Sequence, residues 1–375
     1  MLNAQSYEPE MDDLIESSHL RYIDDFQSGF HRIKKREKSF TYVDEDGNSI
    51  KDAKVLDRIK GLVLPPAWSD VWICRYANGH LQATGYDTIG RKQYRYHDTW
   101  SQVKNASKFD GLAAFGCMLP KLRRQLRKDI KNPVLNKIRV TALAVAVMDE
   151  TFIRAGNTSY EEKYGSYGLT TLKNRHISMK GGACFFRFKG KKGIMQQLSL
   201  NSKALAGLLK KVMDIPGQTL FQYYDEDGEI RRLESGDVND YLKLRMDGGF
   251  TCKDFRTWAG TLLALNFMKK SETEMELQTN AISETERHKR AIAVLDQVAT
   301  ELGNTRTVTK KYYVHPGLLE LYELGLLSRK VKELSHCRPT ALNKTGEKEL
   351  LKLLKWLSSQ AVDSKGRYNF VKLTG

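Results

Sequence analysis

The stretch VTALAVAVMDETFI, residues 140–153, is nearly all apolar. A helix that is apolar on every side belongs in the interior of a protein, so we expect a buried central helix here. Helical spacing continues well beyond this stretch. In AIAVLDQVATELG, the apolar Leu295, Val298 and Leu302 recur at helical intervals, and Gly303 ends the pattern. The larger part of the chain is therefore expected to be mostly helical.

The sequence before residue 106 predicts β-structure instead. Runs of strand-forming residues flank Asp46-Gly47-Asn48 and Asn78-Gly79, which are strong signals for tight hairpin turns. The segment RKQYRYHDTW follows with alternation in its middle, where Gln93 and Tyr94 point to opposite faces of a strand. These patterns favour a small antiparallel sheet.

Three further short strands are expected inside the helical part, in GLTTLKNRHISM, ACFFRFKG and IMQQLSL. The glycine-bounded run at residues 190–193 is the turn between the last two. We therefore expect an α+β protein. It has a small antiparallel β-rich N-terminal domain, residues 1–105, and a larger, mostly helical domain with a small β-sheet, residues 106–375.

The composition points to a polyanionic partner. The 375 residues include 61 Lys and Arg against 45 Asp and Glu, a net charge of +16. Such a field attracts nucleic acid first and an anionic membrane surface second, although a merely basic soluble protein stays open. Five scattered cysteines fit a reducing compartment, and we find no signal peptide or long apolar run. We expect a soluble, intracellular protein that makes no membrane contact.

Common catalytic signatures are missing from the sequence. It holds no GxxxxGK[ST] phosphate loop, no GxGxxG, no HExxH and no GxSxG motif. An ATP-driven, dinucleotide or locally encoded metal mechanism has no support, so we expect no cofactor and no metal. The isolated His97 and His315 are expected to have structural or surface roles.

Phosphate chemistry without a metal needs cationic side chains, an acid and a nucleophile. Arg154 follows the apolar helix, Lys191 sits at the tip of the expected turn, and Lys173 lies on the preceding strand. In KDFRTW, Lys253 and Arg256 share one face of a helix. Taken singly, each could instead be a solvated cation or a partner of a helix dipole.

The segment GNTRTVTKKYYVHP places two tyrosines side by side. Thr305 is expected to begin a helix there. On that helix Tyr312 lies one turn beyond the apolar Val308, and Tyr313 lies one turn beyond the polar Thr309. Helix geometry thus favours Tyr312 for packing and Tyr313 for an exposed hydroxyl.

These segments, in this order, resemble the type IB DNA topoisomerases, in their poxvirus-like and bacterial branch. The resemblance extends from about residue 38 to the 320s and is carried by LPPAWSDVWICRYANGHLQATGYDTIGRKQYRYH, RAGN, YGLTTLKNRHI, FKGKKG, KDFRTW and LGNTRTVTKKYYVHP. It implies ATP-independent relaxation of supercoiled double-stranded DNA. One strand is cut through a 3′-phosphotyrosyl intermediate and rejoined. It also implies an N-terminal DNA-clamp domain, residues 1–105, and a catalytic domain, residues 106–375.

The resemblance assigns roles residue by residue. Tyr313 matches the nucleophile, and Arg154 and Arg256 match the arginines that clamp the non-bridging phosphate oxygens. Lys191 matches the general acid that protonates the departing 5′ oxygen. Lys253 matches a second lysine implicated in that step.

Asn304 stands where many relatives have a histidine, and its amide can donate a hydrogen bond without a charge. Lys173 is left out of the catalytic set because it lies away from the turn. The resemblance also implies DNA contacts for residues of the N-terminal strand and for residues just after Arg154. These are Arg91, Gln93, Tyr94, Tyr96, Asn157 and Tyr160.

Two other functions stay open. A tyrosine recombinase shares the Arg–Lys–Arg–Tyr plan but typically shows a His-x-x-Arg box, where this chain has Lys253-Asp-Phe-Arg256. A non-catalytic basic DNA-binding protein is the alternative from another class. We expect a monomer without an obligate protein partner, cytoplasmic and associated with the nucleoid. The lysine-rich segment KTGEKELLKLLKWLSS is expected to form an amphipathic helix that packs on the body.

Overall fold

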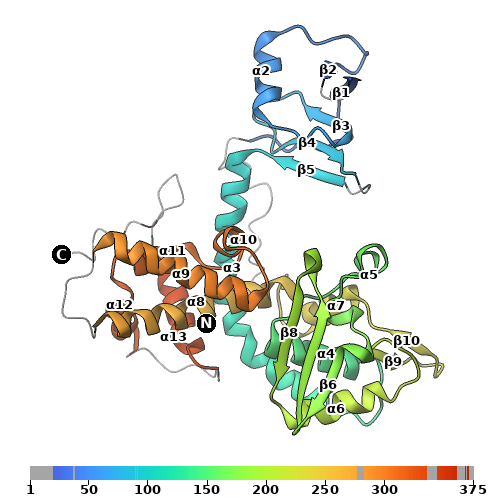
Figure 1. The fold of residues 1–375 in the computed structure, drawn as a ribbon, viewed down its shortest axis with the longest axis vertical. Coiled ribbons are helices and arrows are strands. Elements are labelled where there is room, and N and C mark those ends of the chain that lie inside the picture. The colour runs from blue at the N-terminus through green and yellow to red at the C-terminus, as the bar shows by residue number, and fades with distance from the viewer. Residues whose placement is uncertain are drawn as a thin grey trace. The chain divides into compact units, whose positions relative to one another are not determined.

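The computed structural model describes residues 20–36, 39–88, 90, 92–276, 283–335, 344–360, 368 and 370. The chain divides into two compact units whose boundary falls between Lys108 and Phe109. Each unit is described by itself, and Figure 1 shows the elements of both. Together they confirm the α+β class: an N-terminal β-sheet unit and a larger, mostly helical unit.

The N-terminal unit is built on one five-stranded antiparallel sheet with the order β2-β1-β3-β4-β5. Ile59 of a helix packs with Val71, Ile73 and Ala83 of the sheet to form a small core. The Asn78-Gly79 turn joins β3 to β4 as the sequence predicts. The elements are β1 (Gly29–Arg36), β2 (Ser39–Val43), α2 (Ala53–Gly61), β3 (Ser69–Cys74), β4 (Leu81–Tyr86) and β5 (Lys92–Tyr96).

The first expected hairpin is only partly formed. The chain turns at Gly47, and the Asp44 side chain accepts backbone hydrogen bonds from Asp46 and Asn48. The returning run then makes an isolated bridge between Ser49 and Val43 instead of a full strand.

The second unit holds most of the helices, a three-stranded antiparallel sheet and a two-stranded sheet. α3 (Asp98–Asp129) begins in the N-terminal unit. The other helices are α4 (Lys137–Thr151), α5 (Thr158–Tyr164), α6 (Lys203–Met213), α7 (Ser235–Arg245), α8 (Cys252–Glu276), α9 (Glu284–Leu302), α10 (Arg306–Tyr312), α11 (Pro316–Glu323), α12 (Leu327–Ser335) and α13 (Glu347–Leu357). The strands are β6 (Ile177–Lys180), β7 (Ala183–Lys189), β8 (Met195–Leu200), β9 (Gln222–Tyr224) and β10 (Ile230–Arg232).

The core of this unit surrounds α4. Eleven of the fifteen residues of α4 are buried, and the helix contacts α6, α7 and β8. This confirms the central helix expected from its apolar sequence. α9 ends at Leu302 with Gly303 in the left-handed region (φ 58°), also as expected.

One expected strand is wrong in its first half. Only Ile177–Lys180 forms β6, whereas residues 169–171 and 174–176 form short 3₁₀ turns. Lys173 therefore precedes a turn and does not lie on a strand. Its ammonium forms an ion pair with the carboxylate of Glu161 at 2.6 Å, so the charge of Lys173 is engaged within the fold.

α13 packs on the body of the second unit. Its leucines Leu350, Leu351, Leu354 and Leu357 are all buried, which confirms the expected amphipathic helix. In the part of the chain that the structure describes, no helix is both long and apolar enough to cross a membrane.

Candidate active site

Arg154 is placed by the end of the central helix. α4 ends at Thr151, and Phe152 adopts a left-handed conformation (φ 56°, ψ 22°) that turns the chain. The Arg154 carbonyl accepts a hydrogen bond from Leu169 at 2.7 Å. A Cβ at Gly168 would lie 2.6 Å from that carbonyl oxygen, so the close approach of the two segments requires a glycine.

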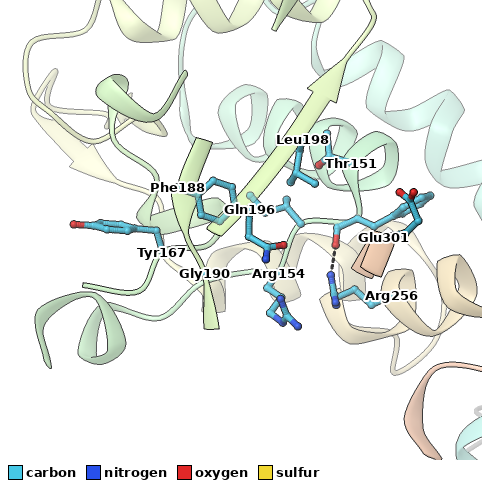
Figure 2. Close-up of a pocket in the computed structure, with 11 residues that line it drawn as sticks. Thr151, Arg154, Tyr167, Phe188, Gly190, Gln196, Leu198, Arg256 and Glu301 are labelled. Carbon is cyan, nitrogen blue, oxygen red and sulfur yellow. Dashed lines mark hydrogen bonds between the residues drawn. The ribbon is translucent and has the colours of Figure 1, made fainter. Parts of the chain in front are cut away.

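Both candidate arginines are anchored by main-chain carbonyls at helix ends. Arg256, on α8, is only 6% exposed and donates to the Phe152 carbonyl at 2.5 Å and to the Leu302 carbonyl at 2.7 Å. Arg154 donates to the Gly303 carbonyl at 3.0 Å. Carbonyls at helix C-termini carry partial negative charge and lack helical partners, which suits them to hold cations. Figure 2 shows Arg154 and Arg256 on the same side of one pocket, with the bond from Arg256 to Phe152 dashed.

The positive charge of the two guanidinium groups is available to bind an external anion. In the described part of the chain, neither Arg154 nor Arg256 forms an ion pair with a carboxylate. Burial, together with the like charge of Arg256, lowers the pKa of Arg154 to about 10. Burial likewise lowers the pKa of Arg256, while Tyr313 opposes the lowering at both sites. At neutral pH both remain cations that a phosphate would stabilise.

Tyr313 is the first residue after α10. Thr305 caps that helix as expected, by accepting from the Val308 amide. The Tyr313 ring is half-buried, with its centroid 5.3 Å from the Cζ of Arg256. Its carbonyl lies 3.1 Å from the Thr261 hydroxyl, and a Cβ at Gly260 would come within 2.5 Å of the same oxygen. The nucleophile candidate thus rests directly on α8, the helix that carries Arg256.

The expected helix faces of α10 are wrong. Tyr312, expected to pack, is 36% exposed, while Thr309, expected on the polar side, is fully buried. Tyr313 is one turn beyond Thr309 and so joins the packed side of the helix, not the exposed one. Threonine is mostly exposed in proteins, which is why the sequence predicts a polar, exposed Thr309, but in this fold the residue is buried. The choice of Tyr313 rests on the resemblance and on its contact with Arg256.

Asn304 lies beside Arg154 in the connection between α9 and α10. Its Oδ1 accepts from Arg154 at 2.6 Å. Among the described residues, its Nδ2 and the Nε of Arg256 are buried donors without a protein partner. Unpaired buried donors are costly, and a bound phosphate oxygen would satisfy them.

The two candidate lysines, Lys191 and Lys253, are exposed. Lys191 occupies the β7–β8 turn, and Lys253 lies in the first turn of α8. Within the described residues, neither ammonium forms an ion pair. Gly190, the neighbour of Lys191, lines the same pocket as Arg154 and Arg256. The turn therefore lies at the site, while its lysine is free to reach a bound substrate.

Gln196 of β8 is a site residue that the sequence does not predict. It lines the pocket, and its side chain packs on Gly303, where a Cβ would fall 2.5 Å from the amide nitrogen. This contact joins the hairpin that carries Lys191 to the segment that holds Arg154. A glutamine in an alternating strand carries no signal of such a role.

Among the expected DNA-contacting residues that the structure describes, Gln93 is half-buried and the others are exposed. Tyr94 and Tyr96 of β5 stack at 6.0 Å between ring centroids, and Gln93 on the same strand donates to Asp87 at 2.9 Å. Asn157 is the exposed cap of α5, and Tyr160, in the first turn of that helix, is 45% exposed. Arg91 lies outside the described residues.

The isolated histidines have structural roles, as expected. His315 is buried and caps α11 by accepting from the Gly317 amide at 3.1 Å. Burial lowers the pKa of His315 to about 3, so it is neutral in the fold. His97 accepts a backbone hydrogen bond from Thr99.

Comparison with protein families gives two matches. Residues 97–335 match the family described as eukaryotic DNA topoisomerase I, catalytic core. Residues 39–87 match the family described as bacterial DNA topoisomerase IB, N-terminal domain.

Individual proteins give consistent matches. A DNA topoisomerase 1B of Acanthamoeba polyphaga mimivirus is 35% identical over 300 residues, which cover 79% of this chain and 88% of the relative. A DNA topoisomerase 1B of vaccinia virus (strain Copenhagen) is 25% identical over 241 residues, covering 63% of this chain and 71% of the relative. A solved structure of the XerH site-specific recombinase in a post-cleavage complex aligns over 56% of this chain and 51% of its own, with 15% identity and a TM-score of 0.34. That TM-score is too low to support an argument.

Proposed function

Because the chain belongs to the type IB DNA topoisomerases, we propose that it relaxes supercoiled duplex DNA without ATP, through a 3′-phosphotyrosyl intermediate at Tyr313. The observation that carries this proposal is the approach of Arg256 to the Tyr313 ring, with Arg154 anchored beside it. Two cations at this position stabilise the negative charge that builds on a phosphate under attack.

The proposed cleavage step is an in-line displacement at phosphorus. Tyr313 loses its phenolic proton to water, its oxygen forms a bond to the scissile phosphorus, and the bond from phosphorus to the 5′ oxygen breaks. Lys191 donates a proton to that departing oxygen, assisted by Lys253. Rejoining is the same reaction reversed, so the bond energy stored in the phosphotyrosine makes ATP unnecessary.

The phosphate is proposed to be held by three side chains. Arg154 and Arg256 bind its non-bridging oxygens, and Asn304 donates through the Nδ2 that has no partner among the described residues. The carbonyl anchors at the helix ends fix both guanidinium groups before DNA arrives. Preorganised donors of this kind contribute more to a transition state than mobile ones.

The rest of the duplex is proposed to be bound by exposed polar and aromatic side chains of both units, in a protein that acts as a cytoplasmic, nucleoid-associated monomer. Arginine, asparagine, glutamine and tyrosine side chains suit contacts with phosphates and base edges. The proposed contacts are Arg91, Gln93, Tyr94 and Tyr96 in the N-terminal unit, with Asn157 and Tyr160 in the second.

The test is relaxation of a negatively supercoiled plasmid in EDTA without ATP. We expect relaxation by the wild type and a covalent protein–DNA adduct on the 3′ end of the cut strand after denaturation. Tyr313→Phe should abolish both while leaving duplex affinity within a few-fold of wild type. Tyr312→Phe, the matched control, should retain activity. Binding without relaxation would instead indicate a DNA-binding protein, and activity only on paired specific sites would indicate a recombinase.

A further inference from the structure

The segment that leads into α13 contacts two elements of the site, although it lies beyond residues 97–335, which match the catalytic core. On one side, the indole N–H of Trp258 on α8 donates to Glu347 at 3.2 Å. On the other side, Lys344 donates to the main-chain carbonyl of Asp149, in the last turn of α4. The segment thus joins the helix that carries Arg256 to the helix that leads to Arg154.

A buried cluster of four charges holds this junction. Arg123 of α3 donates to both Asp149 oxygens, at 2.8 and 3.0 Å, and to both Glu347 oxygens, at 2.8 Å each. Lys344 adds a contact to the Asp149 carboxylate at 3.3 Å. The cationic partners keep the pKa of Asp149 and of Glu347 below their usual values despite burial. At the edge of the cluster, the ammonium of Lys344 also lies 3.5 Å from the carboxylate of the half-exposed Glu150. Each of these carboxylates has a cationic partner, so the cluster is rigid and none is left to compete with phosphate for the site arginines.

Phe152 connects the cluster to the site. It is not a glycine, yet it adopts the left-handed conformation, a strained state that persists where the surroundings impose it. The ammonium of Lys344 lies 5.3 Å from the centroid of its ring. The carbonyl of the same residue accepts the 2.5 Å hydrogen bond from Arg256. Lys344 therefore contacts the ring of this strained residue, and Arg256 binds its carbonyl.

We propose that Lys344 and Glu347 are positioning residues for DNA cleavage: they fix the end of α4, and through Phe152 they set Arg154 and Arg256 in the geometry that the reaction needs. This inference rests on the proposed function. A displacement of about 1 Å at a reacting centre can slow a reaction about 10²-fold. Lys344 and Glu347 can therefore control the rate of cleavage by positioning the arginines, without contacting DNA themselves.

The test compares three variants in single-turnover cleavage of a duplex oligonucleotide and in equilibrium binding of the same duplex. Lys344→Met removes the ammonium and keeps a long side chain. Lys344→Arg restores a cation. Lys348→Met is the matched control, because Lys348 is exposed on the first turn of α13 and its loss changes net charge equally.

We expect Lys344→Met to cleave about tenfold more slowly at saturating protein, with duplex affinity equal to that of Lys348→Met. Lys344→Arg should recover to within about threefold of wild type, as a cation over the ring is restored. Equal cleavage by Lys344→Met and Lys348→Met would overturn the proposal. So would a loss of rate matched by a loss of affinity.

Phe152→Leu gives a second test if Lys344→Met does not fold. This variant keeps every charge and removes the ring that Lys344 contacts. It should also cleave slowly with unchanged affinity, whereas a wild-type cleavage rate would overturn the proposal. Absence of cleavage by the wild type would refute the proposed function. A wild type that cleaves, with variants that cleave equally fast, would refute only the positioning role.

Discussion

At the scale of single residues, the hydrogen bonds of Arg154 and Arg256 to main-chain carbonyls explain how the fold tolerates two cations in its interior. Carbonyl groups at the ends of α4 and α9 accept three hydrogen bonds from the two guanidinium groups without adding a negative charge. A carboxylate in the same place would bind them more tightly but would cancel the field that attracts phosphate. The arrangement favours anion binding over the stability of the folded protein.

Asn304→Asp tests this balance. The substitution keeps the Oδ1 acceptor for Arg154 and replaces the unpaired Nδ2 with a charged oxygen. We expect single-turnover cleavage to fall about 10²–10³-fold, because a donor to the phosphate becomes a repelling anion. We expect the melting temperature of the free protein to rise, because the carboxylate offsets two buried cations.

Asn304→Ala is the control, since it removes the donor without adding a charge. It should slow cleavage and leave the melting temperature at or below that of wild type. A lower melting temperature for Asn304→Asp than for Asn304→Ala would contradict this account of the site.

Sequence reasoning could identify most candidate residues but not how they pack. Arg154 and Arg256 follow from a buried helix and from i,i+3 spacing combined with family motifs, and the structure brings them together around Tyr313. The faces of α10 were predicted wrongly because Thr309 is buried in spite of its hydroxyl. Gln196 could not be predicted, because its contact with Gly303 joins segments more than a hundred positions apart.

At the scale of elements, α13 offers a comparison of a buried and an exposed ion pair on one helix. Glu347→Gln breaks the fully buried pair with Arg123 and should lower the free energy of unfolding by about 3 kcal/mol. Glu349→Gln breaks the half-exposed pair with Lys269 and should cost less than about 1 kcal/mol. Urea denaturation measures both, and equal losses would show that burial does not set the strength of these pairs.

The pH dependence of the same pair has a definite sign. In the folded protein the pKa of Glu347 lies below its ordinary value of 4.5. The ionised carboxylate therefore stabilises the fold fully above pH 4.5, and this contribution is lost as the pH falls through the lower pKa of the folded state. Glu347→Gln should therefore show a shallower loss of stability than wild type on acidification below about pH 4.5.

Some elements escaped prediction for a physical reason. The strand β1, GFHRIKKR, reads as a basic surface segment, yet Arg32 is buried and donates to the carbonyls of Leu64, Pro65 and Trp68. Only the fold supplies those three acceptors. By contrast, α4, α13 and the β7–β8 turn were predictable, because apolar periodicity and glycine placement are local signals.

At the scale of the whole molecule, the net charge of +16 predicts strongly salt-dependent DNA binding. Binding through phosphates releases counterions, so the logarithm of duplex affinity should fall linearly with the logarithm of salt concentration. With six or more phosphate contacts, the loss between about 50 and 200 mM salt is about 10³-fold or more. Fluorescence anisotropy with a labelled duplex measures the slope, and a flat profile would argue against proposed contacts from both units.

Arg256 Nε and Asn304 Nδ2, which have no hydrogen-bond partner among the described residues, also make the site useful in inhibitor discovery. A ligand that binds only the folded protein raises its apparent stability by RT ln(1 + [L]/Kd), where [L] is the free ligand concentration. Compounds that carry a tetrahedral oxyanion would satisfy these donors and relieve the repulsion between the two arginines. A plate-based dye-melting screen with such compounds could find active-site binders directly, without DNA or a supercoiling assay.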